Sequence, residues 1–314
     1  MDLVPYCPDD IVDAATLLGR GLSSHDIERL CRSGRLHRLV RGWFATREPK
    51  GAVDRHLLST RAMLRHFDGR AASSHHSRLL TAGIPVWRAD LSVVHLTRVA
   101  DRGSRSRNGY RLHPAVAGMP HRATPLGLGV SIAGAIVQTG LLNGPMDALI
   151  AADAALHGGL VTVPEIDHAL QLHAGRTGVG PVRAALAHAD GRHESPGETR
   201  LGGVLRDLRI PATPQVWIQT RQGPKRVDAL LDDHPVVLEF DGAVKYLSPL
   251  DLQRVAGRGD APVENPLFVE KVREDAIRDE AYEVVRVVWT QLGDPDGIHR
   301  RIDAAVVRAA RRAS

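Results

Sequence analysis

The sequence is poor in cysteine and has no long apolar run. Its two cysteines, Cys7 and Cys31, lie outside any CxxC pair, which excludes a zinc site of the usual thiolate spacing and a secreted disulfide framework. No apolar run approaches the roughly 18 residues of a membrane span. The first ten residues are acidic, whereas the start of a signal peptide is basic. We therefore expect a soluble, cytoplasmic protein without a membrane partner.

Aromatic residues are also scarce, at 4%, whereas glycine and proline are common, with 30 and 19 residues among 314. This composition indicates short helices and strands joined by many turns. The length suffices for two or three domains. The formal net charge of +5 is small, but it favours an acidic partner such as nucleic acid.

Residues 9–48 have the pattern of two short helices followed by a β-hairpin. Gly19 to Gly21 separate the two helices, and Ser23 or Ser24 is placed to cap the second one, which Gly34 ends. Apolar residues then flank a turn at Arg41–Gly42, as in a hairpin. The pattern predicts a helix-turn-helix with an adjacent β-wing.

Positive charge is concentrated in the same segment. Residues 20–50 carry eight basic and three acidic side chains, a net charge of +5 that equals that of the whole chain. A basic helix in a DNA groove, with more basic residues on its wing, would contact phosphates on either side. The alternative is that these side chains only solvate a small helical domain. The candidate DNA-binding residues are Arg29, Arg32, Arg35, Arg38 and Arg41.

The run GLSSHDIERLCRSGRLHRLVRGWFAT, residues 21–46, resembles the N-terminal winged helix-turn-helix of the AbiEi-type antitoxin family. The resemblance implies a DNA-binding module, of a kind that often represses its own operon in type IV toxin-antitoxin systems. The implied partners are DNA and either a cognate toxin or a second copy of the chain.

Residues 51–190 mix helical and strand patterns, which predicts an α/β connecting domain. We expect a strand at 91–99 and a basic loop at 101–109, whose arginines either contact phosphates or are simply exposed. His75 and His76 form an adjacent pair. Neighbouring side chains on a helix point about 100° apart, so the two would not share a ligand, and we predict a structural or surface role for them.

Acidic residues interrupt a pair of apolar strands near the C-terminus. Residues 226–231 and 236–240 have the pattern of two antiparallel strands joined by a turn. Asp228 lies within the first strand, Glu239 within the second, and Asp241 directly after it. Carboxylates among apolar neighbours are unfavourable unless a cation neutralises them, and a divalent cation is the candidate. The alternative is that these acids only form turns and strand ends.

The whole segment from residue 191 onward predicts the order helix, three strands, helix, strand, which is typical of an α/β domain with a mixed sheet. Glu198 lies on the first turn of the first helix, and Glu194 is placed to cap it. A loose insertion at 247–266 precedes the second helix, and a basic amphipathic helix ends the chain.

This segment resembles the PD-(D/E)XK nuclease core, and in particular its very-short-patch-repair endonuclease-like branch. The matching stretches are ESPGET at 194–199, VD at 227–228, VVLEFDGAVKY at 236–246 and EKVREDAIRDEAYEVVRVVW at 270–289. The standard core has lysine two residues beyond the second acid, where this chain has Asp241; in this branch an acid is usual there and the basic residue follows four positions later, at Lys245.

The resemblance implies a role for each of these residues. Asp228 and Glu239 would hold Mg²⁺, Glu198 would assist from the helix, and Lys245 would approach the scissile phosphate or the attacking water. The implied catalytic set is Glu198, Asp228, Glu239, Asp241 and Lys245, and Asp275 with Arg278 would brace it.

The predicted architecture is a multidomain α/β protein with a winged helix-turn-helix at 1–50, an α/β connecting domain at 51–190 and a PD-(D/E)XK-like domain at 191–314. Two functions follow. One is an antitoxin- or regulator-like DNA-binding protein whose nuclease-like domain is inactive or auxiliary. The other is a Mg²⁺-dependent DNA endonuclease directed by its winged helix. In a third alternative, the middle and C-terminal domains form a platform for a partner toxin.

Overall fold

The computed structural model describes residues 7–242 and 266–313. The chain divides into two compact units, one of Met1–Ala155 with Gly159–Ala189 and one of Leu156–Gly158 with Asp190–Ser314. The described residues form three sheets, of three, six and four strands, together with many helices, so the predicted α/β class is confirmed. No described helix is both long enough and apolar enough to cross a membrane.

The N-terminal part contains the two predicted helices and the predicted hairpin. Ser23 caps the second helix in a capping box with Asp26, which satisfies backbone N–H groups at the helix start. The sheet order is β1-β3-β2, with both pairs antiparallel. Its elements are η2 (Pro8–Asp10), β1 (Ile11–Asp13), α1 (Ala14–Gly19), α2 (Ser24–Arg32), β2 (His37–Arg38) and β3 (Trp43–Ala45).

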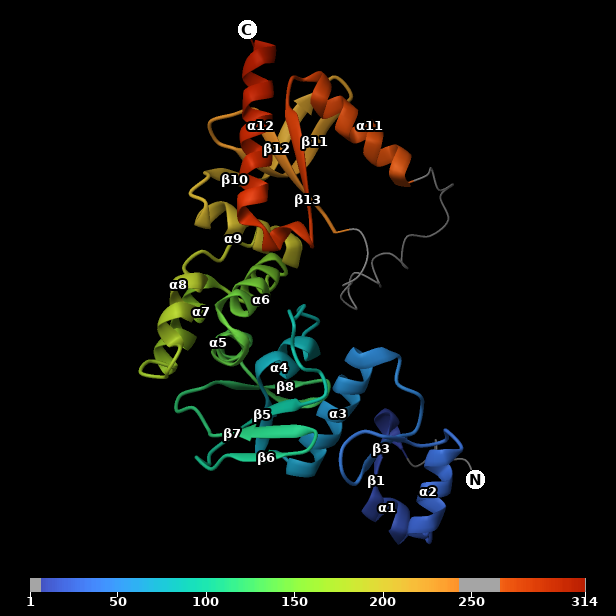
Figure 1. Ribbon diagram of the computed structural model, residues 1–314. Helices are drawn as coiled ribbons and strands as arrows, with labels where there is room; N and C mark the ends of the chain where they lie inside the picture. The colour runs from blue at the N-terminus through green and yellow to red at the C-terminus, as the bar shows by residue number, and fades with distance from the viewer. Residues whose placement is uncertain (1–6, 243–265, 314) are drawn as a thin grey trace. The chain divides into compact units, whose positions relative to one another are not determined.

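Helix α3 (Gly51–Phe67) joins the N-terminal sheet to the next one, as Figure 1 shows. One hydrophobic cluster contains Trp43 from the first sheet, Met63 from α3 and Leu96 from the second sheet. Arg47 strengthens the junction through ion pairs with Asp10 and Asp54, at 2.7 and 2.6 Å. The hydrophobic core therefore includes residues on both sides of position 50. The domain boundary that we predict at this position stays a prediction.

The six-stranded sheet of the first unit has the order β6-β7-β5-β4-β9-β8. Its β5 confirms the strand predicted at 91–99. The predicted loop at 101–109 is partly wrong, because Arg105 to Arg107 pair with the next strand as an edge strand. The elements are β4 (Ala71–Ser73), α4 (His75–Thr81), β5 (Val94–Arg98), β6 (Arg105–Arg107), β7 (Tyr110–His113), β8 (His121–Thr124) and β9 (Gly127–Val130).

Four helices follow this sheet: α5 (Ile132–Asn143), α6 (Pro145–His157), α7 (Val163–Leu172) and α8 (Val179–Leu186). α5 is almost entirely buried because α4, α7 and α8 pack around it. Small residues permit this close packing: a Cβ at Gly140 of α5 would lie 2.7 Å from Ala148 Cβ. A capping box between Thr162 and Glu165 starts α7.

The second unit has the predicted order of helix, three strands, helix and strand. Its sheet order is β10-β11-β12-β13. β11 is antiparallel to both β10 and β12, and β13 runs parallel to β12. The elements are α9 (Pro196–Asp207), β10 (Ala212–Thr220), β11 (Gly223–Leu231), β12 (Val236–Asp241), α11 (Pro266–Asp279), β13 (Glu283–Val288), η3 (Gln291–Gly293) and α12 (Pro295–Ala313).

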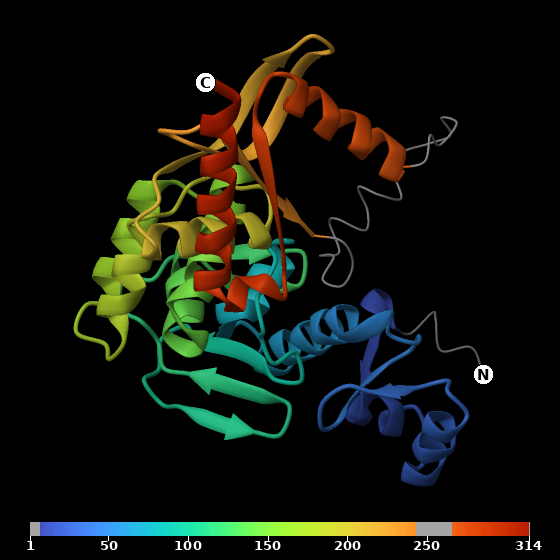
Figure 2. The same ribbon diagram turned by 45° about the horizontal axis from the view of Figure 1, so that its top comes forward.

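Helices cover both faces of this sheet (Figure 2). On one face, Leu201 of α9 and Ile302 of α12 pack with Leu238 of β12. On the other face, Ile277 of α11 packs with Val237 of β12. Strand β12 is thus central and buried from both sides, which explains why Val236 to Leu238 are all apolar. Most of the predicted insertion at 247–266 lies outside the described residues.

Candidate functional site

Three of the predicted acids meet where β11, β12 and the start of α9 come together. β11 and β12 pair antiparallel as far as Ala229 and Leu238, and Asp228 and Glu239 are the next residues on the two strands. Glu198 lies in the first turn of α9, and both glutamates are buried, with 9% and 8% of their surface exposed. The two strands and the helix therefore bring together carboxylates that are up to 41 residues apart in the chain.

Asp228 is the most perturbed of these acids. Burial, together with the neighbouring carboxylates of Glu239 and Glu198, raises its pKa to about 7. Its Oδ2 accepts a hydrogen bond from the backbone N–H of Phe240 at 2.7 Å, which opposes the shift but fixes the side chain. At neutral pH the Asp228 carboxyl group is therefore partly protonated, so it can release a proton or bind a cation.

Glu198 is held in place by a set of short contacts. Its Oε2 accepts hydrogen bonds from the Gln215 side chain at 2.7 Å and from the backbone N–H of Glu194 at 3.0 Å. Gln215 lies opposite Asp228 on β10 and has a positive φ of +56°, so the strand is distorted at this point. The sequence did not identify Gln215, because its role depends on this pairing.

Two predictions about supporting residues are wrong. Glu194 does not cap α9; the cap is Ser195, whose Oγ accepts from the backbone N–H of Glu198, and Glu194 instead pairs with Arg226 at 2.7 Å. Arg278 does not brace the acids either, because it forms an i,i+4 pair with Glu274 at 2.5 Å. Asp275 beside it is exposed.

Arg273 places a cation beside the site, five residues before the predicted Arg278. Its Nη2 lies 2.7 Å from Glu239 Oε2, and its Nη1 donates to the carbonyl of Arg226 at 2.8 Å. Arg273 therefore ties α11 to β11 and β12 and partly neutralises one of the carboxylates. The sequence indicated that the helix after β12 carries a basic residue close to the acids. It did not indicate which position of that helix faces them.

Asp241 ends β12 and is half-buried. Lys245 lies outside the described residues. Of the five residues in the implied catalytic set, the structure thus brings together Glu198, Asp228 and Glu239 and describes the backbone position of Asp241.

These carboxylates have the donor chemistry for a hard divalent cation. Mg²⁺ takes oxygen ligands, keeps several waters and is often bound by only one or two carboxylates, which matches Asp228 and Glu239. In the part of the chain that the structure describes, only His75, His95 and His113 have ligand atoms that all lie within 4.8 Å of one another. The acids are spread more widely, so they fit a site completed by water.

The predicted DNA-binding arginines are all exposed: Arg29, Arg32, Arg35, Arg38 and Arg41. Arg29 pairs with Asp26 at 2.7 Å. An open groove of about 490 Å³ runs between α2 and β2, and Arg32 and Arg38 line it together with Arg55 of α3. Arg55 donates to the Arg38 carbonyl at 2.6 Å. The sequence did not predict Arg55, because α3 joins this groove only through the packing of α3 on the N-terminal sheet.

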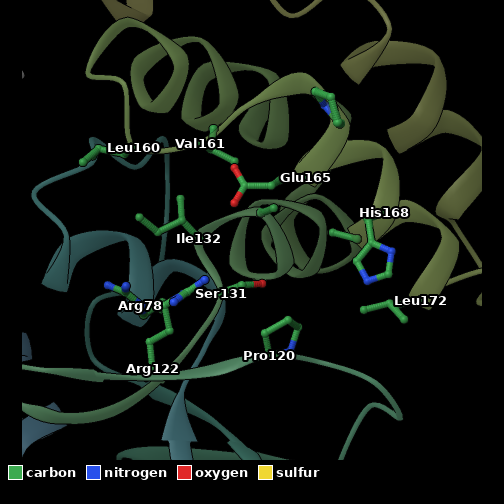
Figure 3. A pocket seen from close by; sticks show the side chains of 13 residues that line it. Arg78, Pro120, Arg122, Ser131, Ile132, Leu160, Val161, Glu165, His168 and Leu172 are labelled. Carbon is green, nitrogen blue, oxygen red and sulfur yellow. The ribbon is translucent and has the colours of Figure 1, made fainter.

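A second cavity, of about 320 Å³, lies in the first unit and is mostly apolar (Figure 3). Arg78 and Arg122 lie at one end and His168 near the other. The guanidinium of Arg78 already donates to the Val130 carbonyl at 3.0 Å and to Thr81 Oγ1 at 3.1 Å. The guanidinium of Arg78 is therefore used in hydrogen bonds that stabilise the local fold.

Comparison with known proteins does not extend these observations: no protein-family model matches the sequence, and no curated protein matches it.

Proposed function

We propose that the protein is an antitoxin- or regulator-like DNA-binding protein that carries a restriction-endonuclease-like domain. The observation that carries the proposal is the basic groove, formed by Arg32, Arg38 and Arg55 between α2 and the β2–β3 hairpin. A helix with a hairpin wing beside it, both with exposed arginines, suits insertion into a DNA groove with phosphate contacts on either side.

The second unit supports the nuclease-like part of the proposal. Its order of helix, three antiparallel strands, helix and parallel strand agrees with the PD-(D/E)XK core that the sequence resembles, and its acids lie on the first helix and on the second and third strands. Such a domain can bind DNA without cleaving it, so the fold alone leaves the activity open.

An active Mg²⁺-dependent endonuclease is the second candidate, and the state of Asp228 favours it. A carboxyl whose pKa rises to about 7 because of burial and two neighbouring carboxylates gains from a bound cation. A Mg²⁺ ion held by Asp228 and Glu239 would lower the pKa of a coordinated water and stabilise charge on the scissile phosphate. Gln215 would keep Glu198 oriented towards the site, and Arg273 would limit the negative charge on Glu239.

The test uses the full chain with plasmid and short duplex DNA, in Mg²⁺, in Mn²⁺ and in chelator. We compare the wild type with Asp228→Asn and with Asp233→Asn, which makes the same change on the exposed turn after β11. DNA binding is measured in parallel for an Arg32→Gln, Arg38→Gln double variant. Its matched control is Arg300→Gln, at an exposed position on α12.

We expect the double variant to bind DNA at least tenfold more weakly than the wild type, and Arg300→Gln to bind as the wild type does. Equal binding by the double variant would contradict the proposal. Metal-dependent cleavage that is lost in Asp228→Asn and retained in Asp233→Asn would establish the endonuclease. If DNA is bound but stays intact in every metal, the regulator-like function stands and the carboxylates serve another purpose.

A further inference from the structure

Three histidines from separate elements meet inside the first unit. His75 is the first residue of α4, His95 lies on β5, and His113 ends β7. One ring nitrogen from each histidine lies within 4.8 Å of the other two, and His95 Nδ1 is 2.9 Å from His113 Nε2. The rings of His75 and His113 stack with their centroids 4.1 Å apart.

The fold holds this cluster, which we call the histidine triad, in a fixed arrangement. β5 and β7 are parallel neighbours, which places His95 and His113 on adjacent strands. The start of α4 is tied to β5, because the backbone N–H of Ser74 donates to the His95 carbonyl at 3.1 Å. His75 has a left-handed φ of +51°, which is uncommon for a residue with a Cβ and which directs it differently from His76.

Of the structural or surface role predicted for His75 and His76, the structure excludes the surface alternative. Both side chains are buried, at 6% and 1% exposure. The argument that adjacent residues would not share a ligand agrees with the structure, since His75 belongs to the triad and His76 does not. His76 instead packs its ring against those of His95 and His56, at 4.7 and 5.4 Å.

The surroundings keep the triad uncharged. Burial, the neighbouring histidines and Arg111 together lower the pKa of His95 to about 2. Burial, Arg111 and Arg176 lower the pKa of His113 to about 4. The pKa of His75 is lowered in the same way, first by burial and then by the neighbouring histidines. Among the described residues, the group of close ligand atoms consists of these three histidines and includes no carboxylate. The imidazoles are thus neutral at physiological pH, which is the form that binds metals.

From the geometry we propose that the histidine triad is a binding site for a transition-metal ion of the Zn²⁺ class. Three imidazole nitrogens without thiolate or carboxylate suit Zn²⁺, Co²⁺, Ni²⁺ or Cu²⁺, and they disfavour Mg²⁺ and Ca²⁺. Ser74 Oγ lies 2.9 Å from His75 Nδ1, so this hydroxyl holds one ring nitrogen and leaves Nε2 for the metal.

The contact between His95 and His113 requires only a small adjustment on binding. With Zn–N bonds of about 2.0–2.1 Å, two nitrogens of a tetrahedral site lie about 3.3 Å apart. The 2.9 Å contact between His95 and His113 would open by a few tenths of an ångström, and their hydrogen bond would be replaced by two metal bonds. The bound ion would join α4, β5 and β7. His173 adds another buried histidine nearby: its Nε2 has no hydrogen-bond partner among the described residues.

The test is metal titration of the full chain, produced without a histidine tag and stripped with chelator. Co²⁺ is the probe, because its visible absorption reports coordination by nitrogen ligands, and Zn²⁺ is then used to displace it. The experiment is done in the Asp228→Asn background, so that the carboxylate site of the second unit does not contribute. This proposal does not depend on the function proposed above.

We expect one equivalent of Co²⁺ to bind and Zn²⁺ to displace it. His95→Gln and His113→Gln should each lower the affinity at least tenfold, whereas His76→Gln, an equally buried neighbour outside the triad, should change it less than threefold. His113 is only half-buried, so its variant keeps the test valid if His95→Gln does not fold. Absence of Co²⁺ binding by the Asp228→Asn protein with its triad intact, or equal binding after His113→Gln, would overturn the proposal.

Discussion

Arg273 Nη2 on α11 lies 2.7 Å from Glu239 Oε2 on β12, and only 10% of the glutamate side chain is exposed. Removing one partner of such a pair leaves a buried charge without compensation, which destabilises a protein by about 3–5 kcal/mol. The same guanidinium competes with any cation that uses Glu239 as a ligand. This relationship connects the stability of the second unit to its affinity for metal.

Arg273→Gln should therefore lower the thermal midpoint in chelator and increase the stabilisation that Mg²⁺ provides. The measurement is thermal unfolding in chelator and in millimolar Mg²⁺. Arg278→Gln is the control, since Arg278 pairs with Glu274 and not with one of the three acids. If Mg²⁺ shifts the midpoints of the wild type and Arg273→Gln equally, Glu239 is not a metal ligand.

Gly197 allows the first turn of α9 to approach β12. A Cβ at this position would lie 1.9 Å from the Phe240 ring, which itself packs edge-on against Trp289. Gly197→Ala should destabilise the second unit by about 3 kcal/mol, because the new methyl group would force α9 and the Phe240 ring apart. Gly180→Ala on α8, where no atom lies within 4 Å of the new Cβ, should be neutral or slightly stabilising.

Chemical denaturation measures the difference in unfolding free energy between these two variants. The metal-dependent properties of the site that contains Glu198 provide a second measurement. Because Gly197 immediately precedes Glu198, displacement of the helix start should also weaken any metal-dependent property of the site. An unchanged unfolding midpoint for Gly197→Ala would show that α9 and β12 are not packed as described.

The salt dependence of DNA binding tests whether Arg55 belongs to the basic groove. Each phosphate contact contributes about 0.9 to the slope of log affinity against log salt concentration. Arg55→Gln should therefore weaken binding at low salt and reduce the slope by about one. Fluorescence anisotropy over a salt series measures both quantities. A slope equal to that of Arg300→Gln would place Arg55 outside the interface.

Asp147 in the first turn of α6 should make the stability of the first unit depend on pH. Burial raises its pKa to about 6 from an ordinary value near 3.8, and it is 8% exposed. The folded state then binds the proton more tightly than the unfolded state. Stability is highest below pH ~4 and falls as the pH rises through 6, by about 3 kcal/mol in total.

Asp147→Asn removes this titration. Relative to the wild type, the variant should gain about 3 kcal/mol of unfolding free energy between pH 4 and pH 7, measured by urea unfolding at several pH values. Asp167→Asn, at an exposed position on α7, provides the matched control and should follow the wild type. If the unfolding free energies of Asp147→Asn and the wild type change in the same way with pH, the pKa of Asp147 is not raised by burial.

The sequence by itself determined the local structure. The two N-terminal helices, their hairpin and the order of elements in the second unit follow from caps, turns and apolar periodicity, which act between residues only a few positions apart. The acids on β11 and β12 were recognisable for the same reason, since a carboxylate within an apolar strand is unusual wherever that strand lies.

Only the tertiary structure decided which side chains meet. The contacts of Arg273 with Glu239 and of Gln215 with Glu198 depend on helix register and strand pairing, and the histidine triad depends on the neighbouring positions of β5 and β7. Nothing in the spacing of His75, His95 and His113 indicates this arrangement. Sheet order is set by non-local packing of many residues, so no local pattern could have predicted it.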